Sequence, residues 1–202
     1  MFSANASPHS TQPRKLRSYL RRGLFVILIV GLVVTNALLI KQNRDLKAFI
    51  ARDQPEILKP GQKLTSLAAK SLSDQRQVVD YGSRPKTVLF VFSPQCTACE
   101  RTVPHWRKII EASVRNQYQV FGVSLGDAVG SSSFLASNGL KLETLIDIDA
   151  ETRAAYKLSL SPLTIVIDNT GKVEKVWPGA FNRQSKQEVE EYFGISGVDE
   201  VK

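Results

Sequence analysis

Apolar and polar positions divide the chain into a charge-free stretch near the N-terminus and a longer part in which short apolar runs alternate with amphipathic segments. In the longer part, the periodicity predicts strands and helices in alternation. We expect strands over residues 87–92, 118–123, 142–146, 163–167 and 173–177, and helices over residues 102–114, 130–137, 150–156 and 186–193. This alternation is typical of an α/β domain, with a largely parallel sheet covered by helices on both faces.

Several positions in this pattern are expected to form the core. The continuous apolar run over residues 87–92, with Phe90 and Phe92, is typical of a strand buried on both faces. The helix that follows places four apolar residues on one face, namely Val103, Trp106, Ile110 and Val114. Trp177 is expected to pack in the last hairpin, and His105 to lie on the surface. Gly171 lies in the turn of that hairpin, where positive φ is required.

The charge-free stretch Gly23–Ile40 predicts a membrane anchor. Its eighteen residues approach the minimum for a spanning helix and exceed most signal-peptide apolar regions. Thr35-Asn36-Ala37 is similar to a cleavage site, but apolar residues continue to Ile40, so an uncleaved signal anchor is favoured over a cleaved peptide. Five basic residues precede the stretch and four follow it. Because long domains translocate largely regardless of charge, we expect the N-terminus inside and the domain outside.

The formal net charge of +8 belongs to the segments that flank the anchor. Residues 1–22 carry +5 and residues 41–63 carry +3, whereas 16 basic and 16 acidic residues cancel from Leu64 onward. A nucleic-acid surface is therefore not expected. The expected parts are a basic cytoplasmic tail whose first 13 residues are disordered, an anchor, a juxtamembrane linker in which Gln42–Ile50 extends the anchor helix, and one domain: residues 1–22, 23–40, 41–58 and 59–202.

Cys96 and Cys99 are the only cysteines among the 202 residues, and they form one C-x-x-C between an expected strand and helix. This placement is typical of a disulfide that is made and broken during function. A zinc site is the weaker alternative, because His9 and His105, the only histidines, lie at no ligand spacing. A structural disulfide across so short a loop would constrain little of the unfolded chain. We expect no metal and no cofactor, since a Gly-rich phosphate-binding loop is also missing from the domain sequence.

The residues around this pair resemble the thioredoxin-fold family. The resemblance lies in Phe92-Ser93-Pro94-Gln95-Cys96-Thr97-Ala98-Cys99 with Pro104, and in Ser161-Pro162 followed by an apolar strand and Gly171. The extra strand and helix between Tyr118 and Tyr156, with Lys59-Pro60-Gly61-Gln62, resemble the membrane-anchored TlpA/ResA-type branch. Over residues 59–193 the resemblance implies a thioredoxin-like α/β fold with a central mixed sheet flanked by helices, preceded by one transmembrane helix.

Each residue of the motif has an expected role. Cys96 lies where the helix begins, so backbone N–H groups and the helix dipole stabilise its thiolate for attack. Cys99, one turn further on, is suited to resolve the mixed disulfide formed at Cys96. In the resembling family the Ser161–Pro162 bond is cis, and the backbone of Ser161 would pair with an extended substrate. Pro104 is expected to be structural, since it removes one helix donor.

Three positions depart from the family pattern. Gln95 stands where relatives commonly have an aromatic residue, Phe90 where thioredoxins have a buried acid, and Thr102 where several TlpA/ResA-type proteins have glutamate. A buried carboxylate would move the proton of the inner cysteine. Glu100 is expected to point away from Cys99, so this step is left to water or to Thr102.

The function expected from this resemblance is thiol–disulfide exchange with exported proteins, more as a reductant than as an oxidant. The expected partners are cysteine-containing exported proteins, apocytochrome c among the candidates, and a membrane protein that donates electrons. The expected location is the bacterial cytoplasmic membrane, with the domain on the periplasmic or extracytoplasmic side. A peroxiredoxin-like peroxidase is the first alternative, although Leu89 stands where that family's proline belongs. A non-enzymatic thiol or metal-handling domain is the second.

Overall fold

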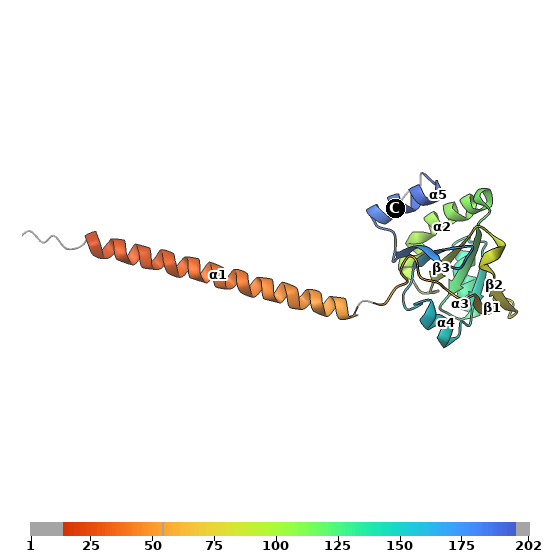
Figure 1. Ribbon diagram of the computed structural model, residues 1–202, viewed down its shortest axis with the longest axis horizontal. Coiled ribbons are helices and arrows are strands. Elements are labelled where there is room, and N and C mark those ends of the chain that lie inside the picture. The colour runs from red at the N-terminus through yellow and green to blue at the C-terminus, as the bar shows by residue number, and fades with distance from the viewer. Residues whose placement is uncertain (1–13, 54, 197–202) are drawn as a thin grey trace, which may run out of the picture. The chain divides into compact units, whose positions relative to one another are not determined.

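The computed structural model describes residues 14–53 and 55–196, and the chain divides into two units at residue 54 (Figure 1). The tail of residues 1–13, for which we expect disorder, lies outside the described residues. The first unit contains one helix, and the second is an α/β domain that begins at Pro55.

α1 (Arg14–Asp53) is one uninterrupted helix of 40 residues. Its part Gly23–Lys47 is long and apolar enough to cross a membrane, and its side chains are exposed. The two polar side chains of the charge-free stretch donate to backbone carbonyls one turn earlier, at 2.8 Å for Thr35 and 3.0 Å for Asn36. Such bonds satisfy groups that a lipid environment leaves without water. The expected extension over Gln42–Ile50 is confirmed, and most of the segment expected as a linker is therefore helical.

A seven-stranded mixed sheet forms the centre of the domain, in the order β2-β1-β5-β4-β3-β6-β7. The strands are β1 (Leu67–Ser71), β2 (Arg76–Val79), β3 (Lys86–Phe92), β4 (Gln119–Ser124), β5 (Glu143–Ile146), β6 (Leu163–Asp168) and β7 (Val173–Pro178). Within the described domain, β3–β4 and β4–β5 are the parallel pairs, and the other four pairs are antiparallel. The expectation of a largely parallel sheet is wrong, because a hairpin at each edge adds antiparallel strands, and the mixed sheet is confirmed.

Helices lie on both faces of this sheet (Figure 1). They are α2 (Thr97–Asn116), α3 (Ala128–Ser137), α4 (Ala150–Ala155) and α5 (Arg183–Phe193), with a short 3-10 turn η1 (Tyr81–Ser83) before β3. Alternate residues of β3 face opposite ways. Phe90 and Phe92 belong to the core shared with α2, α3 and α5, whereas Leu89 and Val91 belong to the core on the α4 side. β3 is thus buried on both faces, as its sequence predicts.

The buried face of α2 differs from the expected one. Val103 and Trp106 are buried, but Ile110 is half-buried and Val114 is exposed. The centre of the buried face lies about a quarter-turn away, over two polar residues, Thr102 and Ser113. A pattern of apolar residues does not register buried polar side chains, which explains the rotation.

Candidate active site

The C-x-x-C pair lies where β3 passes into α2. A turn over residues 93–96 is closed by a hydrogen bond from Cys96 N–H to Ser93 O at 3.1 Å. Cys96 then caps α2, and its sulfur accepts a hydrogen bond from Cys99 N–H at 3.1 Å. The first N–H groups of a helix have no partner within the helix, and the helix dipole is positive there. This end of α2 therefore favours negative charge on the Cys96 sulfur, as the sequence predicts.

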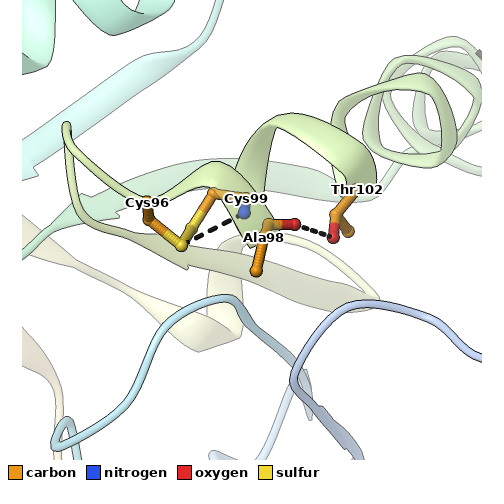
Figure 2. Close-up of a disulfide and its surroundings, with 4 residues drawn as sticks. All are labelled: Cys96, Ala98, Cys99 and Thr102. Carbon is orange, nitrogen blue, oxygen red and sulfur yellow. Dashed lines mark hydrogen bonds between the residues drawn. A yellow bond between two sulfur atoms is a disulfide. The ribbon is translucent and has the colours of Figure 1, made fainter.

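Cys96 and Cys99 are joined by a disulfide, with their Cα atoms 5.2 Å apart (Figure 2). The two residues differ in access. Cys96 is half-buried, whereas Cys99 is completely buried. An external thiol or disulfide can therefore reach Cys96 but not Cys99, which is the order of events that thiol–disulfide exchange through a mixed disulfide requires.

The second element of the motif lies at the start of β6. The Ser161–Pro162 bond is cis, as the resemblance implies, and Pro162 is buried with its carbonyl accepting from Gly179 N–H at 2.8 Å. β6 pairs antiparallel with β3, with Leu163 opposite Val91. The register places Ser161 and Pro162 at the end of the sheet that carries Cys96. Cys96 and Ser161 are 65 residues apart in the sequence. The two elements of the motif nevertheless lie at the same end of the neighbouring strands β3 and β6.

The surroundings of Cys99 contain no acidic side chain at either position where the family has one. Phe90 is buried and stacks on Trp106 with ring centroids 4.9 Å apart. Thr102 is 1% exposed, and its hydroxyl donates to Ala98 O at 3.0 Å (Figure 2). Glu100 is exposed, as expected. The Thr102 hydroxyl proton is therefore committed to the helix backbone.

Pro104 of α2 and Trp177 of β7 have roles in packing and helix structure. Pro104 lies inside α2 and is half-buried. Trp177 is buried, and its ring packs against Tyr192 and Phe193 of α5, with centroids 5.6 and 5.9 Å apart. The packing role expected for Trp177 is confirmed.

The expectation for His105 is wrong: its side chain is 4% exposed. Its ring meets Phe181 edge-on at 5.3 Å, and neither ring nitrogen has a hydrogen-bond partner among the described residues. Burial lowers the pKa of His105; Lys186 lowers it further and Glu190 opposes the change. α5 covers this side of α2, and the sequence of α2 alone gives no sign of that cover.

The sequence also did not single out the loop after β4. Gly126 in this loop and Gly130 in the first turn of α3 approach the ring of Pro94, two residues before Cys96. Their four-residue spacing is the signal that could have been read. Among the described residues, no group of three or more His, Cys, Asp or Glu side chains is arranged to hold a metal ion; His9 lies outside these residues.

Comparisons with known proteins agree with this geometry. Residues 60–176 match the model of the AhpC/TSA family. The thiol-disulfide oxidoreductase ResA of Geobacillus thermodenitrificans is 27% identical over 119 residues, 57% of this chain and 67% of the relative. ResA of Bacillus subtilis is 24% identical over 175 residues, 82% of this chain and 87% of the relative.

A solved structure shows the same fold. It is the thioredoxin domain of a thiol-disulfide oxidoreductase from Bacteroides vulgatus, with a TM-score of 0.56, 14% identity, and coverage of 67% of this chain and 99% of that one. The names of these relatives agree with the enzyme class expected from Cys96 and Cys99, and they do not favour the peroxiredoxin alternative. With a family match that spans more than half of its length and a thioredoxin-like fold around the cysteine pair, the chain belongs to the AhpC/TSA family.

Proposed function

We propose that this chain is a membrane-tethered thiol–disulfide oxidoreductase that reduces disulfides in exported proteins. The observation that carries the proposal is the unequal access to the pair: Cys96 is reachable at a helix N-terminus, and Cys99 is buried behind it. The tether is the charge-free part of α1, residues 23–40, and the catalytic domain is residues 59–202. The excess of positive charge before Gly23 supports an orientation with the domain on the extracytoplasmic side.

The exchange reaction balances with this pair alone. In the reduced protein, the Cys96 thiolate attacks one sulfur of a substrate disulfide, and the other substrate sulfur leaves as a thiolate. The Cys99 thiolate then attacks the Cys96 sulfur and displaces the remaining substrate sulfur. The substrate has gained two electrons and, from solvent, two protons. The protein is left with the Cys96–Cys99 disulfide.

Ser161 is proposed to hold the substrate. In the described part of the chain, its backbone amide and carbonyl make no hydrogen bond within the protein, although Pro162 beside it is buried. Free backbone groups at the end of a strand suit an extended peptide that adds to the sheet. Pro104 would act indirectly, by shaping α2 behind the cysteines.

The partners follow from the electron balance. A protein that ends each cycle as a disulfide needs a dithiol donor, and a tethered domain meets such a donor most readily in the same membrane. We propose a membrane electron-donor protein on one side and cysteine-containing exported proteins on the other, with apocytochrome c as one candidate. This would give the chain a role in extracytoplasmic redox balance and cytochrome c biogenesis.

Insulin-disulfide reduction by the full-length chain in detergent, with dithiothreitol as electron source, tests the proposed activity. Cys96→Ser should abolish reduction, because no accessible thiolate remains. Cys99→Ser should also stop turnover but accumulate a mixed disulfide at Cys96, visible by mass spectrometry after exposure to a model disulfide. Full activity in both variants would exclude the proposal. Peroxide consumption and anaerobic metal titration on the same preparation distinguish the peroxidase and the metal-handling alternatives.

A further inference from the structure

Pro94 lies in the turn that leads from β3 into α2. Pro94 is the second residue of the turn closed by the Cys96 N–H to Ser93 O bond, a position that proline favours because its ring presets φ. Two residues later, Cys96 caps the helix. Because Pro94 and Cys96 belong to the same turn, a displacement of the Pro94 ring would also move the Cys96 sulfur.

Two glycines lie against this ring. A Cβ atom added at Gly126 would lie 2.5 Å from Pro94 Cδ and 2.6 Å from Pro94 Cγ. One added at Gly130 would lie 3.2 Å from Pro94 Cβ and Cγ. Since carbon atoms in contact prefer a separation of about 3.5–4.0 Å, a methyl group at residue 126 demands a movement of about 1 Å. Neither glycine has a positive φ, so the close approach to Pro94, and not the backbone conformation, requires glycine at residue 126 and leaves little room for a side chain at residue 130.

The loop that carries Gly126 and the first turn of α3, which carries Gly130, are held by their own hydrogen bonds. Gly126 N–H donates to Ser124 Oγ at 3.1 Å, and Ser131 Oγ donates to the same oxygen at 2.7 Å. Gly130 N–H donates to Asp127 Oδ1 at 2.8 Å in the N-cap of α3. Ser124 and Ser131 are buried. Because these bonds fix the loop against β4, the Pro94 turn is the side that would yield to added bulk.

We propose that Gly126 and Gly130 are positioning residues, which seat the Pro94 ring and thereby place the Cys96 sulfur for attack on a disulfide. The inference rests on the proposed function, because it concerns how Cys96 is placed for thiol–disulfide exchange. Its first readout is the reactivity of the Cys96 thiol itself, which can be measured whether or not the chain reduces a protein substrate.

The test compares alanine variants of the reduced full-length chain in detergent. Alkylation of Cys96 by iodoacetamide is followed by mass spectrometry from pH 5 to 9, and insulin reduction is measured in parallel. Gly126→Ala should shift the pH at which alkylation is half-maximal and slow insulin reduction by about tenfold or more, since misplacements of about 1 Å have such effects. Gly130→Ala should have a smaller effect. Val129→Ala is the matched control, because Val129 is 81% exposed on the same turn and should leave both readouts unchanged.

A second substitution separates positioning from general damage. Pro94→Ala removes Cγ and Cδ, the two atoms that the new methyl group would meet. The double variant Pro94→Ala/Gly126→Ala should therefore match Pro94→Ala alone within about threefold in both readouts. This comparison stands even where Gly126→Ala alone fails to fold. The inference is overturned if Gly126→Ala gives the same alkylation profile as Val129→Ala. It is also overturned if adding Gly126→Ala to Pro94→Ala impairs the chain as much as adding Gly126→Ala to the parent does. If the parent chain does not reduce insulin, the proposed function fails, while the alkylation comparison still decides the inference.

Discussion

His105 is a buried titratable side chain of α2 whose ring meets that of Phe181 edge-on. Burial lowers its pKa in the folded chain, whereas an imidazole in the unfolded chain titrates near its usual value of about 6.5. The unfolded state therefore binds the proton more readily. The stability that the neutral ring contributes is complete above about pH 6.5 and is lost as the pH falls below that value toward the folded-state pKa.

His105→Phe should remove this acid sensitivity. A phenyl ring keeps the edge-on contact with Phe181 and has no ring nitrogen left without a partner. We expect a melting temperature at pH 7 equal to or above that of the parent, and a smaller fall between pH 7 and pH 5. Calorimetry at several pH values measures both. An equal fall in parent and variant would assign the acid sensitivity to other groups.

Thr102 tests how the proton of Cys99 leaves. Because the Thr102 hydroxyl donates to Ala98 O, we infer that water and not Thr102 accepts this proton. Thr102→Val removes the hydroxyl and keeps the branched shape. If the hydroxyl is not a general base, the rate of mixed-disulfide resolution should stay within about twofold of the parent. Stopped-flow fluorescence across pH 5 to 9 measures that rate. A loss of tenfold or more would show that the hydroxyl takes part in proton transfer.

For single residues, the sequence predicts which side chains react better than it predicts what surrounds them. Cys96, Cys99 and Pro162 are recognisable because their spacing and neighbours are specific. The burial of His105 and Thr102 is not recognisable, because it depends on which helix covers α2. The close approach of Gly126 to Pro94 joins residues 32 positions apart, and a single sequence contains no signal for such a pair beyond the two glycines and their four-residue spacing.

β3, β7 and α5 are tied together by a cluster of polar side chains. Lys86 donates to Glu174 and to Tyr192, each at 2.7 Å, and Tyr192 also donates to Glu174. Burial, together with the hydrogen bond to Glu174, raises the pKa of Tyr192 to about 12. The lysine and glutamate are partly shielded, with 26% and 31% of their side chains exposed. Removal of one partner leaves the others with unsatisfied hydrogen bonds.

Glu174→Gln keeps an acceptor oxygen but removes its charge. Because hydrogen bonds to charged groups are stronger than neutral ones, the change should lower the free energy of unfolding by about 1–2 kcal/mol. Glu111→Gln is the matched control, since it breaks a longer and more exposed pair with Lys108 at 3.5 Å, and exposed pairs contribute little. Urea unfolding of the full-length chain measures both variants. Equal effects would mean that the Lys86 cluster contributes no more than a surface ion pair.

Elements with strong periodicity are predictable from the sequence, and short edge elements are not. The expected ranges for β3, β4 and the β6–β7 hairpin differ from the observed ones by only one residue at either end. The β1–β2 hairpin was missed, because Leu67–Ser71 contains alanine and serine in place of β-branched residues. Its pairing with β5 involves residues far away in the chain, which local patterns do not reveal. That hairpin is one of the two that make the sheet mixed.

For the whole molecule, the decisive question is whether α1 remains attached and which side the domain faces. An alkaline phosphatase fused after Val201 should be active in intact cells, because this enzyme needs export to fold. The product should stay in the membrane fraction at full length. A soluble periplasmic product that starts near Leu38 would instead show that the segment is a cleaved signal peptide. An inactive fusion would contradict the proposed orientation.

The burial of Cys99 behind Cys96 has a consequence under oxidative stress. A peroxide that meets the reduced protein reaches only the Cys96 sulfur and converts it to a sulfenic acid. With Cys99 one helical turn away, this species can condense with the Cys99 thiol, which releases water and forms the internal disulfide. The product is the same disulfide that thiol–disulfide exchange forms, and a dithiol reductant reverses it. The arrangement of the two cysteines therefore gives the nucleophile a route away from irreversible over-oxidation.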